Sequence, residues 1–201
     1  MSVMYSCSHC PTRSCARGGE QPANCPMRLE SALIQDTIAW NKGDTDSVAL
    51  LTAAAESPKT PAGVTRNRVE EIIAFSQRMG WRRLGVAFCI MFAHEARVLC
   101  DQLAHAGFEV VPVCCKVGAV GLPELGVPIC DGKAACNPVT QAALLNTNAT
   151  ELNIALGLCL GHDLLFAKHA EGPVTTLAVK DRALRHQPLD ALRPVAGEGR
   201  V

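Results

Sequence analysis

The feature of this sequence that most constrains its fold is an alternation of short apolar segments with longer amphipathic ones. Four apolar segments read as buried strands, at residues 84–88, 108–113, 152–156 and 174–179. Three segments between them have the apolar spacing of helices, at residues 92–106, 137–146 and 163–170. Such an alternation specifies a parallel sheet with helices on its faces. We therefore predict an α/β fold, a Rossmann-like parallel sheet of about four strands flanked by helices.

The chain before this domain has a different amino-acid composition. Residues 1–26 are rich in Cys, Pro, Ser, Arg and Gly and contain little that could build a core. Two to three helices are expected next, at residues 27–43, 44–56 and 65–80, with a Pro- and Gly-containing turn at 57–63. The predicted organisation is a cysteine-rich segment (1–26), a helical segment and linker (27–63), the Rossmann-like domain (64–193) and a tail (194–201).

Four cysteines near the N-terminus have the spacing of metal ligands. Cys7, Cys10, Cys15 and Cys25 form a C-x2-C-x4-C-x9-C pattern. Four thiolates so placed suit either a zinc ion or a 4Fe-4S cluster, and the Cys-Pro at Cys25 is also found in bacterial ferredoxin motifs. A segment with so little core folds most simply around a bound metal. We predict a zinc or 4Fe-4S site here, with His9 as an alternative to one of the thiols.

A second group of cysteines falls where the predicted strands end. Cys89 follows the first strand, Cys114 and Cys115 follow the second, and Cys159 follows the third. Ligands of open parallel sheets bind at the carboxyl ends of the strands, so these thiols are expected at one edge. Cys136, at the start of a helix, is expected to join them. The leading prediction is a second metal site of Cys89, Cys115, Cys136 and Cys159, such as a 4Fe-4S cluster with one open iron.

A metal-free chemistry competes at Cys159. The segment Gly157-Leu-Cys-Leu-Gly161 matches a nucleophile elbow with Cys in place of Ser, where a strand turns into a helix. Candidates for the base and its orienting partner follow it in the chain: His162, His169, Asp181 and His186. Cys159 is therefore an alternative catalytic nucleophile.

Polar residues are expected at the same edge. Lys116 follows the second strand, His162 and Asp163 follow the third, and Lys180-Asp-Arg182 follows the fourth. They could bind an anionic substrate or transfer protons. We select Lys116, His162 and Asp163 as catalytic candidates, although Asp163 also suits a helix cap, and residues 180–182 suit a solvated turn.

The charge and the hydropathy of the sequence argue against nucleic acid and membranes as partners. Lys and Arg number 19, as do Asp and Glu, so no net charge attracts nucleic acid or an anionic membrane. The most apolar stretch, residues 152–167, is interrupted by polar residues and is too short to span a membrane. The N-terminus lacks a secretory signal, and the cysteines number eleven, an odd count. A soluble, cytoplasmic protein with reduced thiols is expected, whose partner is a small-molecule substrate or a redox protein; nothing sets its oligomeric state.

Several motifs together carry a resemblance to a known family. They are the N-terminal C-x2-C-x4-C-x9-C pattern, Cys136-Asn-Pro, Gly157-Leu-Cys-Leu-Gly-His-Asp163 and Pro173-Val-Thr-Thr-Leu-Ala-Val-Lys-Asp-Arg182. Over nearly its whole length the chain resembles a bacterial and archaeal family of uncharacterised proteins described as predicted metal-binding. The resemblance implies metal binding through cysteines and assigns no substrate, reaction or catalytic residue.

Three hypotheses follow. The first is a cysteine-ligated metalloprotein that carries out redox or Lewis-acid chemistry on a small molecule. The second is a metal-independent thiol hydrolase or transferase that uses Cys159. The third is a metal carrier or electron-transfer partner without catalytic activity, whose N-terminal segment docks to another protein. The sequence leaves open whether the protein is an enzyme.

Overall fold

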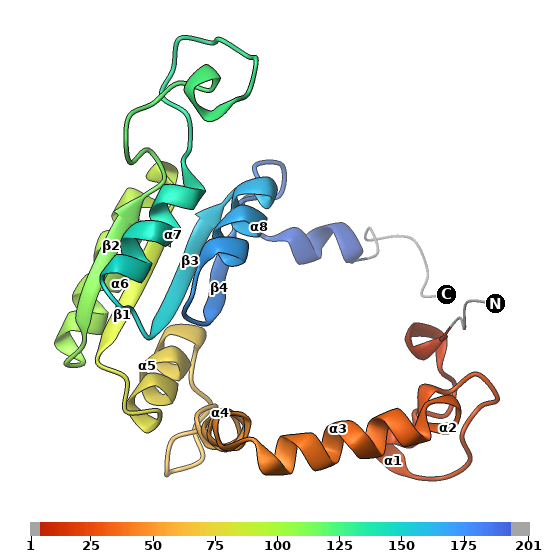
Figure 1. Ribbon diagram of the computed structural model, residues 1–201. Coiled ribbons are helices and arrows are strands. Elements are labelled where there is room, and N and C mark those ends of the chain that lie inside the picture. The colour runs from red at the N-terminus through yellow and green to blue at the C-terminus, as the bar shows by residue number, and fades with distance from the viewer. Residues whose placement is uncertain (1–4, 194–201) are drawn as a thin grey trace. The chain divides into compact units, whose positions relative to one another are not determined.

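The computed structural model describes residues 5–193 and divides the chain into two compact units, Met1–Ala55 and Glu56–Val201 (Figure 1). The predicted tail, residues 194–201, lies outside the described residues. Among residues 5–193, no helix is both long and apolar enough to cross a membrane.

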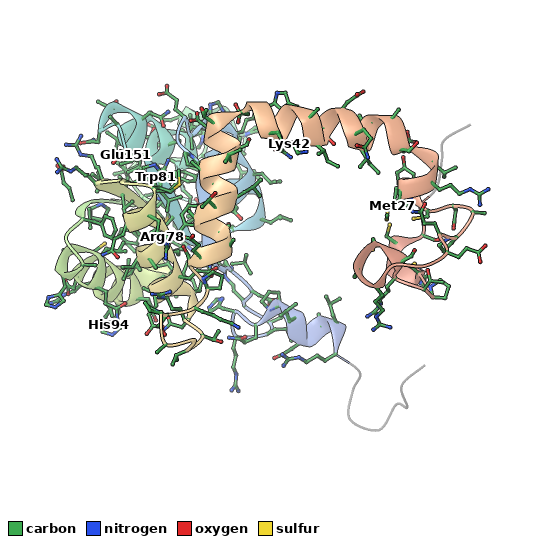
Figure 2. The ribbon with its side chains drawn as sticks, turned by 90° about the horizontal axis from the view of Figure 1, so that it is seen from below. Met27, Lys42, Arg78, Trp81, His94 and Glu151 are labelled. Atoms are coloured by element: carbon green, nitrogen blue, oxygen red, sulfur yellow. The ribbon has the colours of Figure 1, made fainter. Side chains whose placement is uncertain are left out.

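The first unit consists of short turns followed by helices. Its elements are η1 (Cys7–His9), α1 (Ser14–Arg17), α2 (Pro26–Leu29), α3 (Ser31–Gly43) and α4 (Thr45–Glu56), which ends at the unit boundary. The single helix expected over residues 27–43 is broken at Glu30, which has φ −120° and ψ 34°. Figure 2 shows α3 with its side chains, from near Met27 to Lys42. No residue of α2 or α3 is buried, so this unit has little apolar core of its own.

The second unit is built on a four-stranded parallel sheet of order β2-β1-β3-β4 (Figure 1). The strands are β1 (Arg83–Phe88), β2 (Glu109–Cys114), β3 (Leu152–Leu158) and β4 (Val174–Val179). Every residue of β3 is buried, as expected for an inner strand covered on both faces. The predicted α/β class and Rossmann-like parallel sheet are confirmed.

Helices cover both faces of the sheet. The crossover helix α6 (Ala93–His105) packs on β1 and β2, while α7 (Pro138–Thr147) and α8 (Leu160–His169) pack against each other on the opposite face (Figure 1). Right-handed crossovers require this split, because β2 lies on one side of β1 and the pair β3 and β4 lies on the other. The largest fully buried side chains include Phe166, Leu84, Leu103, Leu145 and Ile154.

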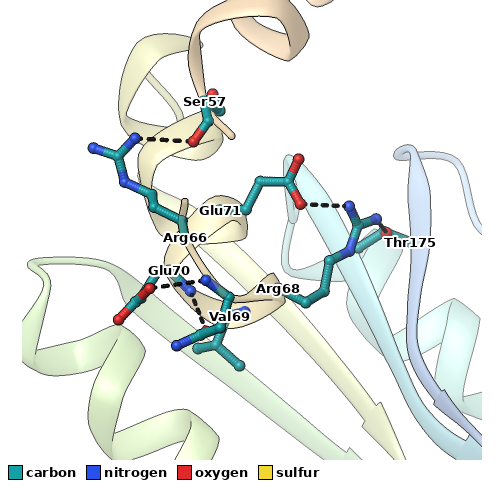
Figure 3. Close-up of polar contacts among 8 residues, drawn as sticks. Ser57, Arg66, Arg68, Val69, Glu70, Glu71 and Thr175 are labelled. Carbon is teal, nitrogen blue, oxygen red and sulfur yellow. Dashed lines mark hydrogen bonds and ion pairs between the residues drawn. The ribbon is translucent and has the colours of Figure 1, made fainter. Parts of the chain in front are cut away.

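Helix α5 (Arg68–Arg78) precedes the sheet and is fixed at its start (Figure 3). Asn67 and Glu70 form a capping box, in which the Asn67 side chain accepts from the Glu70 N–H and the Glu70 carboxylate accepts from the Asn67 N–H. Arg68 bridges from this helix to β4 by donating to Thr175 at 2.8 Å. Arg66, in the preceding turn, donates to the Ser57 carbonyl at 2.9 Å.

The amino ends of the strands are joined by a carboxylate. Glu151, just before β3, accepts hydrogen bonds from the backbone N–H groups of Arg82 and Arg83, at 2.6 and 2.9 Å. Figure 2 labels Glu151 and Trp81 at this end of the sheet. Trp81 packs on Phe75 of α5, with ring centroids 5.7 Å apart. The polar junction thus lies at the opposite end of the strands from the cysteines.

Candidate functional site

The strand order places a topological switch point between β1 and β3. From β1 the chain crosses by α6 to β2, whereas from β3 it crosses by α8 to β4 on the other side and over the other face. The segments that leave the two carboxyl ends therefore diverge, which is where open α/β sheets bind ligands. Cys89 directly follows β1 and Cys159 directly follows β3. The predicted strand-end positions of both cysteines are thus observed.

Cys89 and Cys115 occupy equivalent positions on neighbouring strands. The register pairs Phe88 with Cys114, and the Cys115 N–H donates to the Phe88 carbonyl at 2.8 Å. The buried side chain of Gln141 donates to the carbonyls of Val113 and Phe88, at 2.7 and 3.3 Å. The Gln141 amide therefore holds together the carboxyl ends of β1 and β2, just before Cys89 and Cys115.

Three sulfur atoms and one ammonium group meet at this edge. The Lys180 Nζ donates to the Cys89 Sγ at 2.8 Å, and the Cys136 Sγ lies 3.6 Å from the Cys115 Sγ. The Cys115 Sγ also accepts from the Ile90 N–H at 3.4 Å. Cys136 is brought there because the next residue, Asn137, donates its N–H to the Cys115 carbonyl at 2.8 Å. We call Cys89, Cys115, Cys136 and Lys180 the edge cluster.

The members of the edge cluster differ in acidity. Burial opposes ionisation of Cys89, but hydrogen bonds from Lys180 and the Met91 N–H outweigh it and bring the pKa of Cys89 below its ordinary value. A further hydrogen bond with Cys115 acts in the same direction. Burial raises the pKa of Cys115 to about 12. Cys89 is therefore the more acidic of these two thiols, with its sulfur against the Lys180 ammonium group, and Cys115 is the less acidic.

Of the three polar candidates, Lys116 and His162 lie near one another, and His162 also lies near Lys180 of the edge cluster. Burial lowers the pKa of His162, and the nearby Lys116 and Lys180 lower it further, so this imidazole is neutral near pH 7. Burial raises the pKa of Asp163. The Lys116 Nζ donates to the Ala134 carbonyl. The cap alternative for Asp163 is wrong, because α8 starts at Leu160 and its N-cap residue is Cys159.

Cys159 differs from the nucleophile of an elbow. Its φ of −72° and ψ of 153° are ordinary extended values, whereas an elbow holds its nucleophile on a strained turn. The unusual conformation belongs to Gly157, with φ +66°, where an added Cβ would lie 2.2 Å from the Phe92 ring. Of the proposed bases, His186 accepts from the Asp181 N–H at 3.0 Å and packs edge-on against Phe92. This pair closes a turn after β4.

The four N-terminal cysteines line one cavity of about 90 Å³, which also touches Ser6, Arg13, Ser14 and Asn24 among others. Cys10 and Cys25 are half-buried, while Cys7 and Cys15 are exposed. Asn24 donates to the Ser6 hydroxyl at 2.6 Å, which holds the neighbours of Cys25 and Cys7 together.

The Cys10 sulfur has a stabilising contact in this cavity. It accepts from the Arg13 N–H at 3.3 Å, and this hydrogen bond, with one from Thr12, lowers the pKa of Cys10. The alternative ligand His9 is exposed and contacts Ser8. Within residues 5–193, no three or more His, Cys, Asp or Glu side chains converge closely enough to form a metal site as they stand.

Lys180, expected at this edge but not among the three selected catalytic candidates, is a member of the edge cluster. Its segment suits a solvated turn equally well, yet it follows β4 as the cysteines follow their strands, and its N–H donates to the Leu158 carbonyl at 3.2 Å. The signal for Lys180 in the sequence is its position directly after a parallel strand. Ligands bind at the carboxyl ends of such strands, and this rule predicts a site at Lys180 as it does at Cys89.

Comparison with known proteins identifies the family of this chain. A family profile described as "Protein of unknown function (DUF1847)" matches residues 25–177. The chain belongs to this family. An uncharacterised protein of Methanocaldococcus jannaschii, MJ0455, is 35% identical over 189 residues, covering 92% of each chain. No solved structure matches. The DUF1847 match includes Cys89, Cys115, Cys136 and Cys159, and it begins at Cys25, the last of the N-terminal four.

Proposed function

We propose that this DUF1847 protein binds a metal through Cys7, Cys10, Cys15 and Cys25, as a zinc ion or a 4Fe-4S cluster. The observation that carries the proposal is that all four side chains line one cavity. Four thiolates are a complete ligand set for either group. The sulfurs converge fully only when the metal draws them together.

The composition of the first unit supports this proposal. Because α2 and α3 bury no side chain, the turns before them need another source of cohesion. The polar contacts present are few, chiefly Asn24 with Ser6 and Tyr5 with Glu30, the latter at 2.8 Å. A metal bound by four thiolates supplies on the order of 10 kcal/mol or more of folding free energy. Zinc would act as a structural cross-link, whereas a cluster would add one-electron transfer.

A second candidate function is thiol chemistry at the edge cluster, favoured by the contact between Lys180 and Cys89. A cation against a sulfur stabilises the thiolate, which is the nucleophile and also the metal-binding form. The neutral His162 and the ammonium groups of Lys116 and Lys180 suit a small anionic substrate. A second metal at Cys89, Cys115, Cys136 and Cys159, and a carrier role without catalysis, remain predictions.

The test is anaerobic purification of the full chain, followed by metal analysis and a visible spectrum. One equivalent of zinc in a colourless protein, or iron with inorganic sulfide in a coloured protein, supports the proposal. Replacing Cys7 and Cys10 by Ser should remove this metal. Cys130→Ser is the matched control, since Cys130 is equally exposed but lies outside the cavity. Metal retained by the double variant, or absent from the unmodified protein, contradicts the proposal.

A further inference from the structure

We propose that the edge cluster reacts with hydrogen peroxide, which oxidises Cys89, and that the oxidation then passes through Cys115 to Cys136. The three thiols lie in a chain in which each contacts the next: Cys89 with Cys115, and Cys115 with Cys136 at 3.6 Å. The inference concerns residues of the second unit alone, so it does not depend on a metal in the first.

The first step takes place at Cys89. Its thiolate attacks one peroxide oxygen, the O–O bond breaks, and a sulfenic acid forms while hydroxide leaves. The Lys180 ammonium, 2.8 Å from the sulfur, donates a proton to the hydroxide, so water departs and the lysine becomes a neutral amine. The peroxide is reduced by two electrons, and the Cys89 sulfur is oxidised by two.

The second step joins Cys89 to Cys115. The Cys115 thiol attacks the sulfenic sulfur, the S–O bond breaks, and the Cys115 proton leaves with the hydroxyl group as water. Equivalent residues on adjacent strands are about 4.8 Å apart, within the Cα separation that a disulfide accepts, about 4.4–6.8 Å. The register, with Phe88 opposite Cys114, gives Cys89 and Cys115 this relationship.

The third step transfers the disulfide toward the surface. The Cys136 sulfur attacks Cys115, gives its proton to the neutral Lys180 amine directly or through water, and displaces Cys89 as a thiolate. A thiolate stabilised by a cation leaves fastest, so Lys180 favours this direction. Overall, one peroxide and two thiols yield one disulfide and two waters, and Cys89 and Lys180 return to their starting states.

Burial selects the oxidant. Cys89 is only 3% exposed and Cys115 only 1%, so a bulky disulfide or alkyl electrophile cannot approach the thiolate, whereas a molecule hardly larger than water can. Cys136 is half-buried, and the final disulfide is therefore the one that an external thiol could reach and reduce. The order of burial matches the direction of transfer.

The experiment uses the reduced full-length protein, mixed anaerobically with one equivalent of hydrogen peroxide. At set times the protein is unfolded in the presence of an alkylating agent, so that buried thiols also react, and it is mapped by mass spectrometry without reduction. The expected product is a disulfide between Cys115 and Cys136. Cys136→Ser should stop at a disulfide between Cys89 and Cys115. Cys115→Ser should stop at a Cys89 sulfenic acid, which dimedone labels when the protein is unfolded in its presence. Cys100→Ser, a half-buried thiol outside the cluster, should change nothing.

Lys180 gives a separate readout. Lys180→Met should slow the loss of the Cys89 thiol several-fold, because the sulfur loses the cation that stabilises its thiolate, and Lys180→Arg should restore most of the rate. The proposal fails if Cys89 is oxidised no faster than Cys100 in the unmodified protein, or if Cys89→Ser still forms the disulfide between Cys115 and Cys136 at the normal rate. It also fails if the purified protein carries a metal that protects all three thiols.

Discussion

The two cysteine groups are assembled in opposite ways. The N-terminal four are close in sequence, half-buried or exposed, and belong to a unit whose helices α2 and α3 bury nothing. The edge cluster gathers Cys89, Cys115 and Cys136 from distant parts of the chain, and the hydrogen-bonded ends of β1 and β2 fix two of them. Short spacing lets a ligand organise a site, whereas long spacing requires a core to do so.

This difference predicts which site survives the loss of its ligand. A site that the ligand organises should lose its structure with the ligand, because binding energy and folding energy are then the same quantity. A site that a core organises should persist while the core is intact. A change made in one cysteine group should therefore leave the other group unaltered.

The largest effect is expected from replacing Cys7, Cys10, Cys15 and Cys25 together by Ser. The proposed metal should be lost completely, and protease cleavage within residues 5–30 should become rapid. The thermal unfolding of the second unit should not change, because its buried core includes none of these residues. Metal analysis, limited proteolysis and calorimetry measure the three outcomes. An equal loss of stability in the second unit would show that the two units do not behave separately.

The next largest effect is expected at Gly157. Gly157→Ala places a Cβ 2.2 Å from the Phe92 ring on a residue with φ +66°. Left-handed strain and overpacking together should cost about 2–5 kcal/mol in the free energy of unfolding. Gly161→Ala is the matched control, with open space around its Cβ and an ordinary φ, and should be neutral. Metal content of the first unit should be the same in both variants, and chemical denaturation gives the stabilities.

A smaller effect is expected from Gln141→Leu. The substitution removes the amide that donates to the Val113 and Phe88 carbonyls and should destabilise the second unit by about 1–3 kcal/mol. Because these carbonyls precede Cys115 and Cys89, the contact between Lys180 and Cys89 should loosen as well. Alkylation of Cys89 should therefore become faster in the folded protein, while alkylation of Cys7 should not. Unchanged labelling of Cys89 would mean that Gln141 does not position the cluster.

The strands of the second unit could be predicted from the sequence because apolar and amphipathic segments alternate regularly there. Each predicted strand lies within one or two residues of an observed strand, and the rule for carboxyl ends of parallel strands placed Cys89, Cys115 and Cys159 correctly after β1, β2 and β3. Boundaries were less predictable. Helix α8 begins at Leu160 rather than Asp163, because residues 160–162 continue directly from the N-cap Cys159.

Contacts made by long side chains could not be read from the pattern. Lys180 follows β4 and reaches Cys89 after β1 across the intervening strand β3, and no local spacing encodes that contact. Likewise, the glycine pattern around Cys159 resembles an elbow, yet Gly157 serves to admit Phe92 and to adopt a positive φ. A glycine required by packing and one required by chemistry look the same in a single sequence.

The smallest effect is expected at the amino ends of the strands, the opposite end of the sheet from the edge cluster. Two backbone N–H groups, of Arg82 and Arg83, hold the pKa of Glu151 below its ordinary value. Because the pKa of this carboxyl is lower in the folded state, its ionisation stabilises the folded protein at pH values above the pKa of the unfolded chain. This stabilisation is lost as the pH falls through the folded-state pKa. Glu151→Gln keeps an acceptor oxygen but removes the titration, so it should cost less than about 1 kcal/mol at pH 7, because solvent screens this carboxylate. The cost should vanish at a pH below the folded-state pKa, which denaturant unfolding across the acid range measures. Peroxide oxidation of Cys89 should be unaffected, and a change there would mean that the two ends of the sheet are coupled.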